Sequence, residues 1–230
     1  MRKYIVLVAA ALVTTAANAA LLGRLPLTPG GADYQAYYDT DLDITWVADA
    51  DLAATNTFGL PRSASTVPPA GQVGRYGQMN WYTAQNWIGA MNAVDYLGAS
   101  NWRLPTTAQP DPTCDTQFDA GGGYPIFGDG YSCTGSEMGH LRNVDGVVGG
   151  GQYQNVYWTG TTYAPQPAYA WVFYLSIGYQ LQGDKNYYNY AWPVAPGDPF
   201  NAVPLPAGAW LLPSALAALG WVKRAGKTGA

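Results

Sequence analysis

Glycine and proline occur throughout this chain, and their spread constrains its fold more than any other feature. The 230 residues include 28 Gly and 17 Pro, with no Gly-x-y period that would indicate a collagen-like helix. Both residues interrupt helices, so this spread disfavours a helical bundle. Hydrophobic residues make up 48% of the chain, which is too many for a largely disordered protein. We therefore expect one compact, loop-rich domain with many short strands.

The first residues are typical of a secretory signal peptide. Three residues with two positive charges, Met1-Arg2-Lys3, precede an apolar run over residues 4–13, and Ala17-Asn18-Ala19 fits a small-x-small cleavage site. The alternative is a buried N-terminal strand or helix. Charge, run length and cleavage residues agree on a signal peptide over residues 1–19, so we expect the mature chain to be exported.

The other end carries a second candidate targeting signal, over residues 203–230. It opens with a short proline-containing motif made of Val203, Pro204, Leu205, Pro206 and Ala207. An apolar stretch over residues 208–222 and a basic tail follow, in the order expected of a membrane segment with cytoplasmic retention. This arrangement resembles the VPLPA variant of the PEP-CTERM sorting signals. The resemblance implies an exosortase-type processing enzyme and a Gram-negative envelope, and the alternative is a plain C-terminal membrane anchor.

Between these ends, residues 20–202 form an acidic domain. All 15 acidic residues lie within it, whereas part of the 11 basic residues lies in the two terminal signals, so the domain is more acidic than the whole-chain charge of −4. An acidic surface repels polyanions, so we expect no nucleic-acid partner and no charge-driven binding of sulfated glycans.

Cys114 and Cys133 are the only cysteines. An isolated pair in an exported chain favours a disulfide, and the glycine-rich residues 121–123 between them leave the loop free to close. Two alternatives are open. One is a catalytic thiol, for which His140 is the available base, and the other is a zinc site formed by the two cysteines with His140.

One long helix and one short helix are expected. Asn80 can cap a helix that runs to about Tyr96, and a shorter helix is expected from Ser136 to Leu141. Helical spacing predicts a buried stripe on the long helix, formed by Trp81, Ala84, Ile88 and Met91 and widened by Trp87 and Val94.

Short strands are expected on both sides of these helices. Residues 36–39 and 44–47 flank an acidic turn. In the last third, the strand signals cover residues 156–159, 169–177 and 187–194, with turns at Gly178 and Gly183-Asp184. Strands followed by helices and then strands indicate an α+β fold.

Aromatic-rich segments occur in a fixed order along the domain. They are D-L-D-I-T-W at residues 41–46, N-W-R-L-P-T at 101–106, S-E-M-G-H-L at 136–141, Y-W-T-G-T at 157–161 and A-W-V-F at 170–173. Together they resemble the Lcl C-terminal domain family, over roughly residues 33–199. The family's founding member is the end domain of a collagen-like bacterial adhesin that binds glycosaminoglycans, and most relatives have no established activity.

The resemblance implies a fold similar to C-type lectins and to the formylglycine-generating-enzyme superfamily. We therefore predict a C-type-lectin-like α+β fold with short twisted antiparallel sheets, one main helix, long loops and one disulfide. The chain departs from the family at residues 195–198, where the Arg that often precedes Gly-Asp is absent. A role for that position in binding an anionic ligand is therefore in doubt.

Three alternating carboxylates, Asp39, Asp41 and Asp43, form a candidate calcium site. In an extended turn they would share one side, and Ca²⁺ prefers oxygen ligands. The EF-hand pattern fails, because Ile44 stands where Gly is needed and Ala50 where the closing Glu is needed. The alternative is an acidic turn between two strands.

Glu137 and His140 are the only glutamate and the only histidine. At positions i and i+3 of a helix they would share one face and could serve a metal ion or a general acid/base pair. No second such motif completes a site. The alternative, which we favour, is a hydrogen-bonded structural pair that supports the disulfide loop.

Four tyrosines near the last strands, Tyr179, Tyr187, Tyr188 and Tyr190, are candidate ligand-binding residues. Their rings can stack on sugars, and nearby Gln180, Gln182, Asn186 and Asn189 offer amide hydrogen bonds. The alternative is that these aromatics fill the core and cover the sheet.

These features together predict an exported, non-enzymatic protein of the cell surface or extracellular matrix. Its expected ligand is extracellular carbohydrate, in adhesion or biofilm assembly, and its expected membrane link is the C-terminal segment. A structural envelope or matrix protein without a specific ligand is the alternative, and a secreted enzyme of the formylglycine-generating type is a third. No cofactor is expected apart from the candidate calcium ion.

Overall fold

A computed structural model describes residues 21–119, 121–123, 127–148 and 156–201. The chain divides into two units, Met1–Pro199 and Phe200–Ala230, and the first carries all helices and strands of the described residues. The predicted signal peptide, residues 1–19, and the predicted sorting segment, residues 203–230, lie outside the described residues. Within the described ranges, no helix combines the length and the apolar character that crossing a membrane requires.

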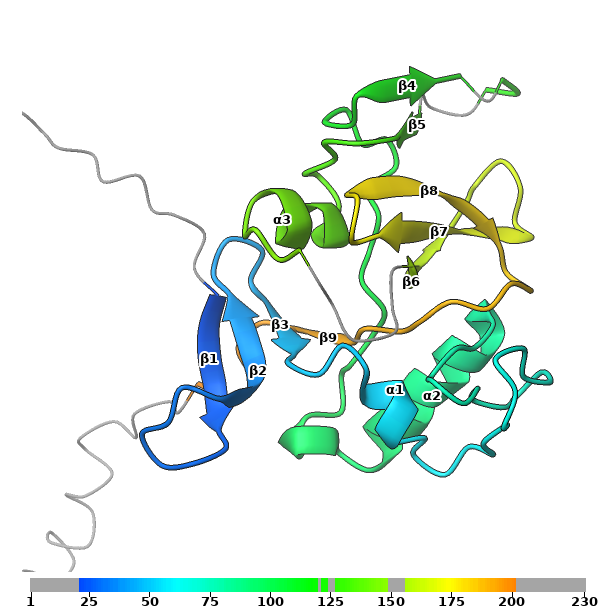
Figure 1. The fold of residues 1–230 in the computed structure, drawn as a ribbon. Helices are drawn as coiled ribbons and strands as arrows, with labels where there is room; N and C mark the ends of the chain where they lie inside the picture. Colours follow the sequence, from blue (N-terminus) through cyan, green and yellow to red (C-terminus); the bar gives the residue numbers. More distant parts are fainter. Residues whose placement is uncertain (1–20, 120, 124–126, 149–155, 202–230) are drawn as a thin grey trace, which may run out of the picture. The chain divides into compact units, whose positions relative to one another are not determined.

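The first unit contains three separate sheets, and all strand pairs in them are antiparallel (Figure 1). The 4-stranded sheet has the order β1-β2-β3-β9, with strands β1 (Leu21–Pro26), β2 (Tyr34–Asp39), β3 (Ile44–Val47) and β9 (Val194–Pro196). The 2-stranded sheet pairs β4 (Thr116–Phe118) with β5 (Phe127–Asp129). The 3-stranded sheet has the order β6-β7-β8, with strands β6 (Val156–Thr162), β7 (Tyr169–Tyr174) and β8 (Tyr179–Asp184).

The helices are α1 (Leu52–Thr55), α2 (Trp81–Ala93), α3 (Glu137–Asn143) and a 3₁₀ turn over Tyr96–Gly98. With one main helix, small antiparallel sheets and one disulfide, the predicted α+β class is confirmed. Residues 57–77 form a long loop that contains no helix or strand.

The main helix α2 begins where the sequence predicts. The Asn80 side chain accepts a hydrogen bond from the backbone N–H of Thr83, which satisfies one of the free donors at the helix start. The helix ends at Ala93, and Val94, which is 59% exposed, does not widen its buried stripe. That part of the prediction is wrong because the backbone turns left-handed at Asp95, only two residues after the helix ends.

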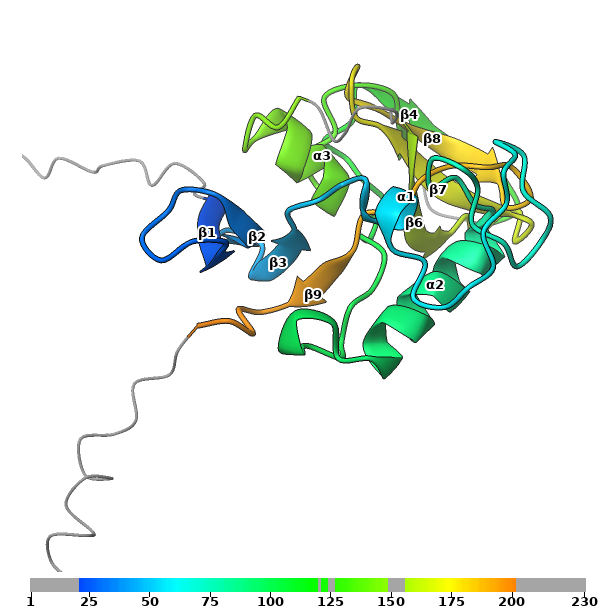
Figure 2. The ribbon, with the colours of Figure 1, turned by 60° about the horizontal axis from the view of Figure 1, so that its bottom comes forward.

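Helix α2 lies beside the 3-stranded sheet (Figure 2), and two tryptophans join the start of this helix region to the sheet. The Nε1 atom of Trp81 donates to the carbonyl oxygen of Thr159 at 2.9 Å, and the Nε1 atom of Trp158 donates to the carbonyl oxygen of Met79 at 2.9 Å. The Trp158 ring is buried and the Trp81 ring is partly buried, and the single polar atom of each keeps a partner. Trp158, from the Y-W-T-G-T segment of the family pattern, therefore joins elements that are far apart in the sequence.

The expected strand over residues 187–194 is wrong. The third strand of this sheet is β8, which pairs with β7 along its whole length, from Tyr169 opposite Asp184 to Tyr174 opposite Tyr179. The expected turn at Gly178 is confirmed, but Gly183 and Asp184 belong to β8. The segment after β8 instead crosses to the 4-stranded sheet, where Val194 begins β9.

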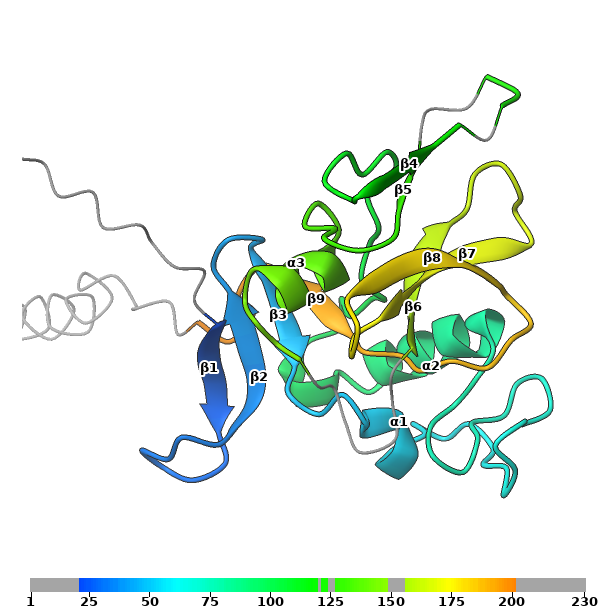
Figure 3. The same ribbon diagram turned by 45° about the horizontal axis from the view of Figure 1, so that its top comes forward.

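Helix α3 lies between the 4-stranded and the 3-stranded sheet (Figure 3). Its buried residues Met138 and Leu141 join a core cluster drawn from both sheets. The other buried members of this cluster are Ile44, Trp46, Ala50, Tyr157, Phe173, Leu175, Trp192 and Val194. The buried side chains of α3 therefore lie between the two larger sheets.

Candidate functional site

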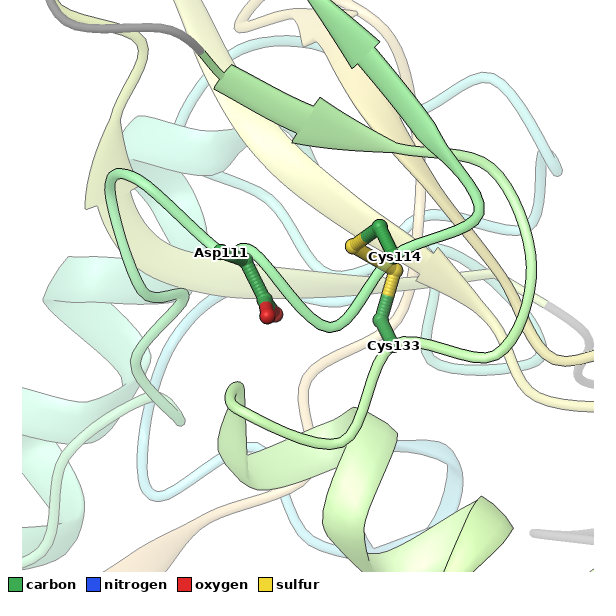
Figure 4. Close-up of side chains that lie close together, drawn as sticks. All are labelled: Asp111, Cys114 and Cys133. Carbon is green, nitrogen blue, oxygen red and sulfur yellow. A yellow bond between two sulfur atoms is a disulfide. The ribbon is translucent and has the colours of Figure 1, made fainter.

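Cys114 and Cys133 form the expected disulfide, which closes the loop between them. Figure 4 shows the Asp111 carboxylate in the same loop region. That carboxylate accepts hydrogen bonds from the backbone N–H of Thr113 and from the Ser136 hydroxyl, the latter at 2.7 Å. The disulfide removes both thiols as metal ligands and as nucleophiles, so this group of side chains is structural.

Glu137, at the start of α3, binds Arg103 of the N-W-R-L-P-T segment and does not form the expected pair with His140. Its two carboxylate oxygens accept from the two terminal nitrogens of Arg103 at 2.8 and 2.7 Å. The backbone N–H of Thr106 donates to the same carboxylate at 2.7 Å. A bidentate pair of this kind fixes both position and orientation, so it anchors α3 to the preceding loop.

The turn between β2 and β3 lies beside α3 (Figures 1 and 3), and the His140 side chain reaches toward this turn. Its Nε2 atom lies 3.9 Å from an Asp41 carboxylate oxygen and 3.9 Å from an Asp145 carboxylate oxygen. Asp39, at the end of β2, completes a group with His140 and Asp145 whose ligand atoms all lie within 4.8 Å of one another.

Asp39, Asp41 and Asp43 do not share one side of the turn. Asp39 is fully buried, and its Oδ1 atom accepts from the backbone N–H groups of Asp41 and Leu42, both at 3.0 Å. Asp41 reaches toward His140, whereas Asp43 accepts a hydrogen bond from the Tyr38 hydroxyl at 2.8 Å. The turn is thus stabilised locally by Asp39, and only two of the three candidate residues face a common point.

Asp145 follows α3 and was not predicted to take part in any site. Its side chain is 1% exposed. Burial raises its pKa to about 6, and the neighbouring carboxylate of Asp39 adds to the rise, whereas His140 opposes it. Its position after a short helix provides no sequence signal, because nothing in the local pattern links it to Asp39.

Tyr179 forms one wall of an open aromatic hollow, which we call the tyrosine hollow. It is about 220 Å³ in volume and is lined by Tyr131, Tyr174, Ile177, Tyr179 and Leu181. The ring of Tyr131 packs edge-on against that of Tyr179, with 4.7 Å between the ring centroids. Tyr131 is 47% exposed, so an aromatic ring is presented to solvent.

A backbone bridge brings the two halves of the tyrosine hollow together. Gly130 and Gln180 exchange two backbone hydrogen bonds, both 2.9 Å long, which places Tyr131 beside Tyr179. Sequence reasoning missed Tyr131 and Tyr174, because this contact joins the disulfide loop to β8. The available signal was a lone tyrosine two residues before Cys133.

The other three candidate tyrosines do not join this hollow. Tyr187 is 67% exposed beyond the far end of β8, and Tyr188 is half-buried nearby. Tyr190 packs against Tyr157 at the edge of the core, with 6.3 Å between ring centroids. The four predicted tyrosines therefore separate into one hollow residue, two surface residues and one packing residue.

Fold and site together define a disulfide-bridged α+β domain of small antiparallel sheets that presents aromatic rings at its surface. The family model described as the Lcl C-terminal domain matches residues 35–195, and the chain belongs to this family. Membership indicates a surface or secreted protein. No curated protein and no solved structure matches the chain.

Proposed function

We propose that this protein is a non-enzymatic surface or secreted protein that binds extracellular carbohydrate through the tyrosine hollow. The observation that supports it is the grouping of Tyr131, Tyr174 and Tyr179 around one open hollow. Tyrosine rings offer an apolar face for the C–H face of a sugar and a hydroxyl for its hydrogen bonds. Residues 1–19 would direct export, and residues 203–230 would serve sorting by an exosortase-type enzyme.

The charges near the hollow favour neutral or amino sugars over sulfated ones. Burial raises the pKa of Tyr179, and the negative charge of Asp129 adds to that effect. Asp115 also lies near enough to act on Tyr179 in the same direction. The Asp115 carboxylate accepts a hydrogen bond from the backbone N–H of Tyr131 at 2.8 Å, so it lies close to the hollow. Carboxylates near a binding surface accept hydrogen bonds from sugar hydroxyls and repel sulfate groups. In this respect the chain is expected to differ from the glycosaminoglycan-binding founding member of its family.

The lining of the tyrosine hollow also supports a binding role rather than an enzymatic one. None of its lining residues, Tyr131, Tyr174, Ile177, Tyr179 and Leu181, is a serine, cysteine, histidine or carboxylate. The nucleophile and base that acyl transfer or glycoside hydrolysis needs are thus missing from the described lining. The single histidine lies instead beside the β2–β3 turn.

A glycan array probed with the purified mature protein tests this function. We expect binding to neutral glycans that falls at least tenfold in Tyr131→Ala and in Tyr179→Ala. The matched control is Tyr82→Ala, which removes a tyrosine that is 50% exposed on α2, away from the hollow. Circular dichroism of each variant checks that the fold is intact.

Two results would contradict the proposal. If neither neutral nor charged glycans bind, the structural matrix protein without a ligand becomes the better interpretation. If binding is lost in Tyr187→Ala but kept in both hollow variants, the ligand contacts the far end of β8 instead.

A further inference from the structure

Three side chains beside the β2–β3 turn present buried polar atoms that lack hydrogen-bond partners among the described residues. Within the described residues, no hydrogen-bond donor reaches Oδ2 of Asp39 or either carboxylate oxygen of Asp145 while both carboxylates are ionised, and no partner reaches Nε2 of His140. Asp39 is 0% exposed, and the Asp145 side chain is 1% exposed. Buried polar atoms are almost always paired, so a group of them in one place requires an explanation.

These atoms converge on one point. The ligand atoms of Asp39, His140 and Asp145 all lie within 4.8 Å of one another, and His140 Nε2 lies 3.9 Å from Asp145 Oδ1. A metal ion with bonds of about 2.0–2.2 Å holds its ligand atoms roughly 3–3.5 Å apart. Small side-chain movements would therefore bring all three atoms onto a single ion.

We propose that Asp39, His140 and Asp145 bind a divalent metal ion of the zinc class. Two or three carboxylates in a buried site need a positive charge, and a divalent cation supplies it. The imidazole nitrogen distinguishes between ions, because Zn²⁺ accepts mixed nitrogen and oxygen ligands whereas Ca²⁺ prefers oxygen alone. The site shares Asp39 with the calcium site considered from the sequence but contains different partners.

Asp41 is the nearest further ligand. One of its carboxylate oxygens lies 3.9 Å from His140 Nε2, and its side chain is 40% exposed. It therefore connects the buried atoms to solvent and can complete the coordination once an ion enters. Asp43 is held by the Tyr38 hydroxyl and takes no part.

The surroundings of Asp39 resemble those of a metal ligand held in place by its neighbours. Its Oδ1 atom accepts from the backbone N–H groups of Asp41 and Leu42, which fixes the carboxylate and leaves Oδ2 facing the cluster. His140 is carried by α3, and Asp145 follows the end of that helix. An ion would therefore tie the end of α3 to the β2–β3 turn, independently of the tyrosine hollow.

The single histidine makes the test direct, because the untagged chain gives one imidazole signal. The chain, freed of metal by a chelator, is titrated with ZnCl₂ while the ¹⁵N resonances of His140 are followed by NMR. We expect saturation at one ion per chain and a change at Nε2. Affinity should fall at least tenfold in Asp145→Asn and in Asp39→Asn.

The control is Asp95→Asn, an exposed acidic residue whose left-handed backbone Asn tolerates well. It should bind Zn²⁺ as the unaltered chain does. Because Asp39 also holds its own turn, a misfolded Asp39→Asn would leave Asp145→Asn to decide. The proposal is overturned if Zn²⁺ leaves the His140 resonances unchanged, or if the folded Asp145→Asn variant binds as before. CaCl₂ binding without any change at His140 would also overturn it.

Discussion

The two ends of α3 differ in how their buried polar groups are satisfied. At the start of the helix, the Glu137 carboxylate accepts three hydrogen bonds, two from Arg103 and one from Thr106. At the other end, His140 Nε2 has no hydrogen-bond partner among the described residues, and no donor among them reaches either oxygen of the ionised Asp145 carboxylate. Helix α3 and the two residues that follow it thus hold a complete polar network and an incomplete one.

Under the proposed metal site, this difference separates polar groups that hold the fold together from polar groups that bind an ion. A satisfied network stabilises and orients the elements it joins, and it needs nothing further. An unsatisfied network lowers the stability of the fold. Such local conflicts occur where a site serves another purpose. The comparison therefore points to opposite effects of mutation at the two ends.

The largest expected effect is at the start of the helix. Replacing Glu137 with Ala leaves Arg103 and the Thr106 N–H without their acceptor, which should lower the free energy of unfolding by about 2–4 kcal/mol. This change in the free energy of unfolding is measured by urea denaturation, with tryptophan fluorescence as the signal. Unchanged stability would show that the pair does not anchor α3.

A smaller loss of stability is expected at Ser136, one residue before Glu137. The buried Ser136 hydroxyl donates to the Asp111 carboxylate at 2.7 Å, so Ser136→Ala leaves that buried oxygen one donor short. We expect a loss of about 1–2 kcal/mol in the same measurement. Ser63→Ala, an alteration in the loop over residues 57–77, is the control and should cost less than Ser136→Ala.

At Asp145, just beyond the end of α3, we expect a substitution to raise stability instead of lowering it. In the presence of a chelator, Asp145→Asn removes a buried charge and gives Asp39 an amide donor, so stability should rise by roughly 1 kcal/mol. In the presence of Zn²⁺ the gain should disappear, because the variant has lost a ligand. A clear loss of stability in chelator would mean that Asp145 stabilises the metal-free fold.

The smallest expected effect is a dependence of folding stability on pH. The pKa of Asp145 is raised to about 6, above that of the same group in an unfolded chain. Above pH 6 the carboxylate is ionised in both states, and the folded state bears the cost of burying its charge. As the pH falls through 6, only the folded state gains the proton, so stability rises.

That rise should be visible between pH 7 and pH 5 in the metal-free chain, and it should be reduced in Asp145→Asn. The charged groups around Asp145 are Asp39, Asp41 and His140, and they are common to both chains. The difference between the two pH profiles therefore isolates Asp145. If stability depended on pH in the same way in both chains, Asp145 would not be the group responsible for the rise.

Local patterns were sufficient to predict much of the fold. The Asn80 cap and the helical spacing of the buried stripe predicted the start of α2, because both signals lie within a few residues. The cysteine pair predicted the disulfide in the same way. The role of Glu137 was missed although it is the only glutamate, because its partner Arg103 lies in a different segment.

The remaining errors come from contacts between distant segments. Residues 187–194 are aromatic and favour a strand, but β7 pairs with the more polar β8, which follows directly after the Gly178 turn. Likewise, the tyrosine hollow depends on the bridge between Gly130 and Gln180, and the buried cluster depends on α3 reaching the β2–β3 turn. No periodic pattern in the sequence indicates either contact.

The loop closed by Cys114 and Cys133 also carries Tyr131, one wall of the tyrosine hollow. The same covalent link that stabilises the domain thus limits where its aromatic surface can assemble. In a reducing compartment the loop loses its covalent constraint, and the position of Tyr131 then depends on hydrogen bonds, those of the Gly130–Gln180 bridge and those between Tyr131 and Asp115. On the proposed route of export, oxidation would act as a maturation step, because the proposed ligand would meet a complete aromatic surface only once the disulfide has formed.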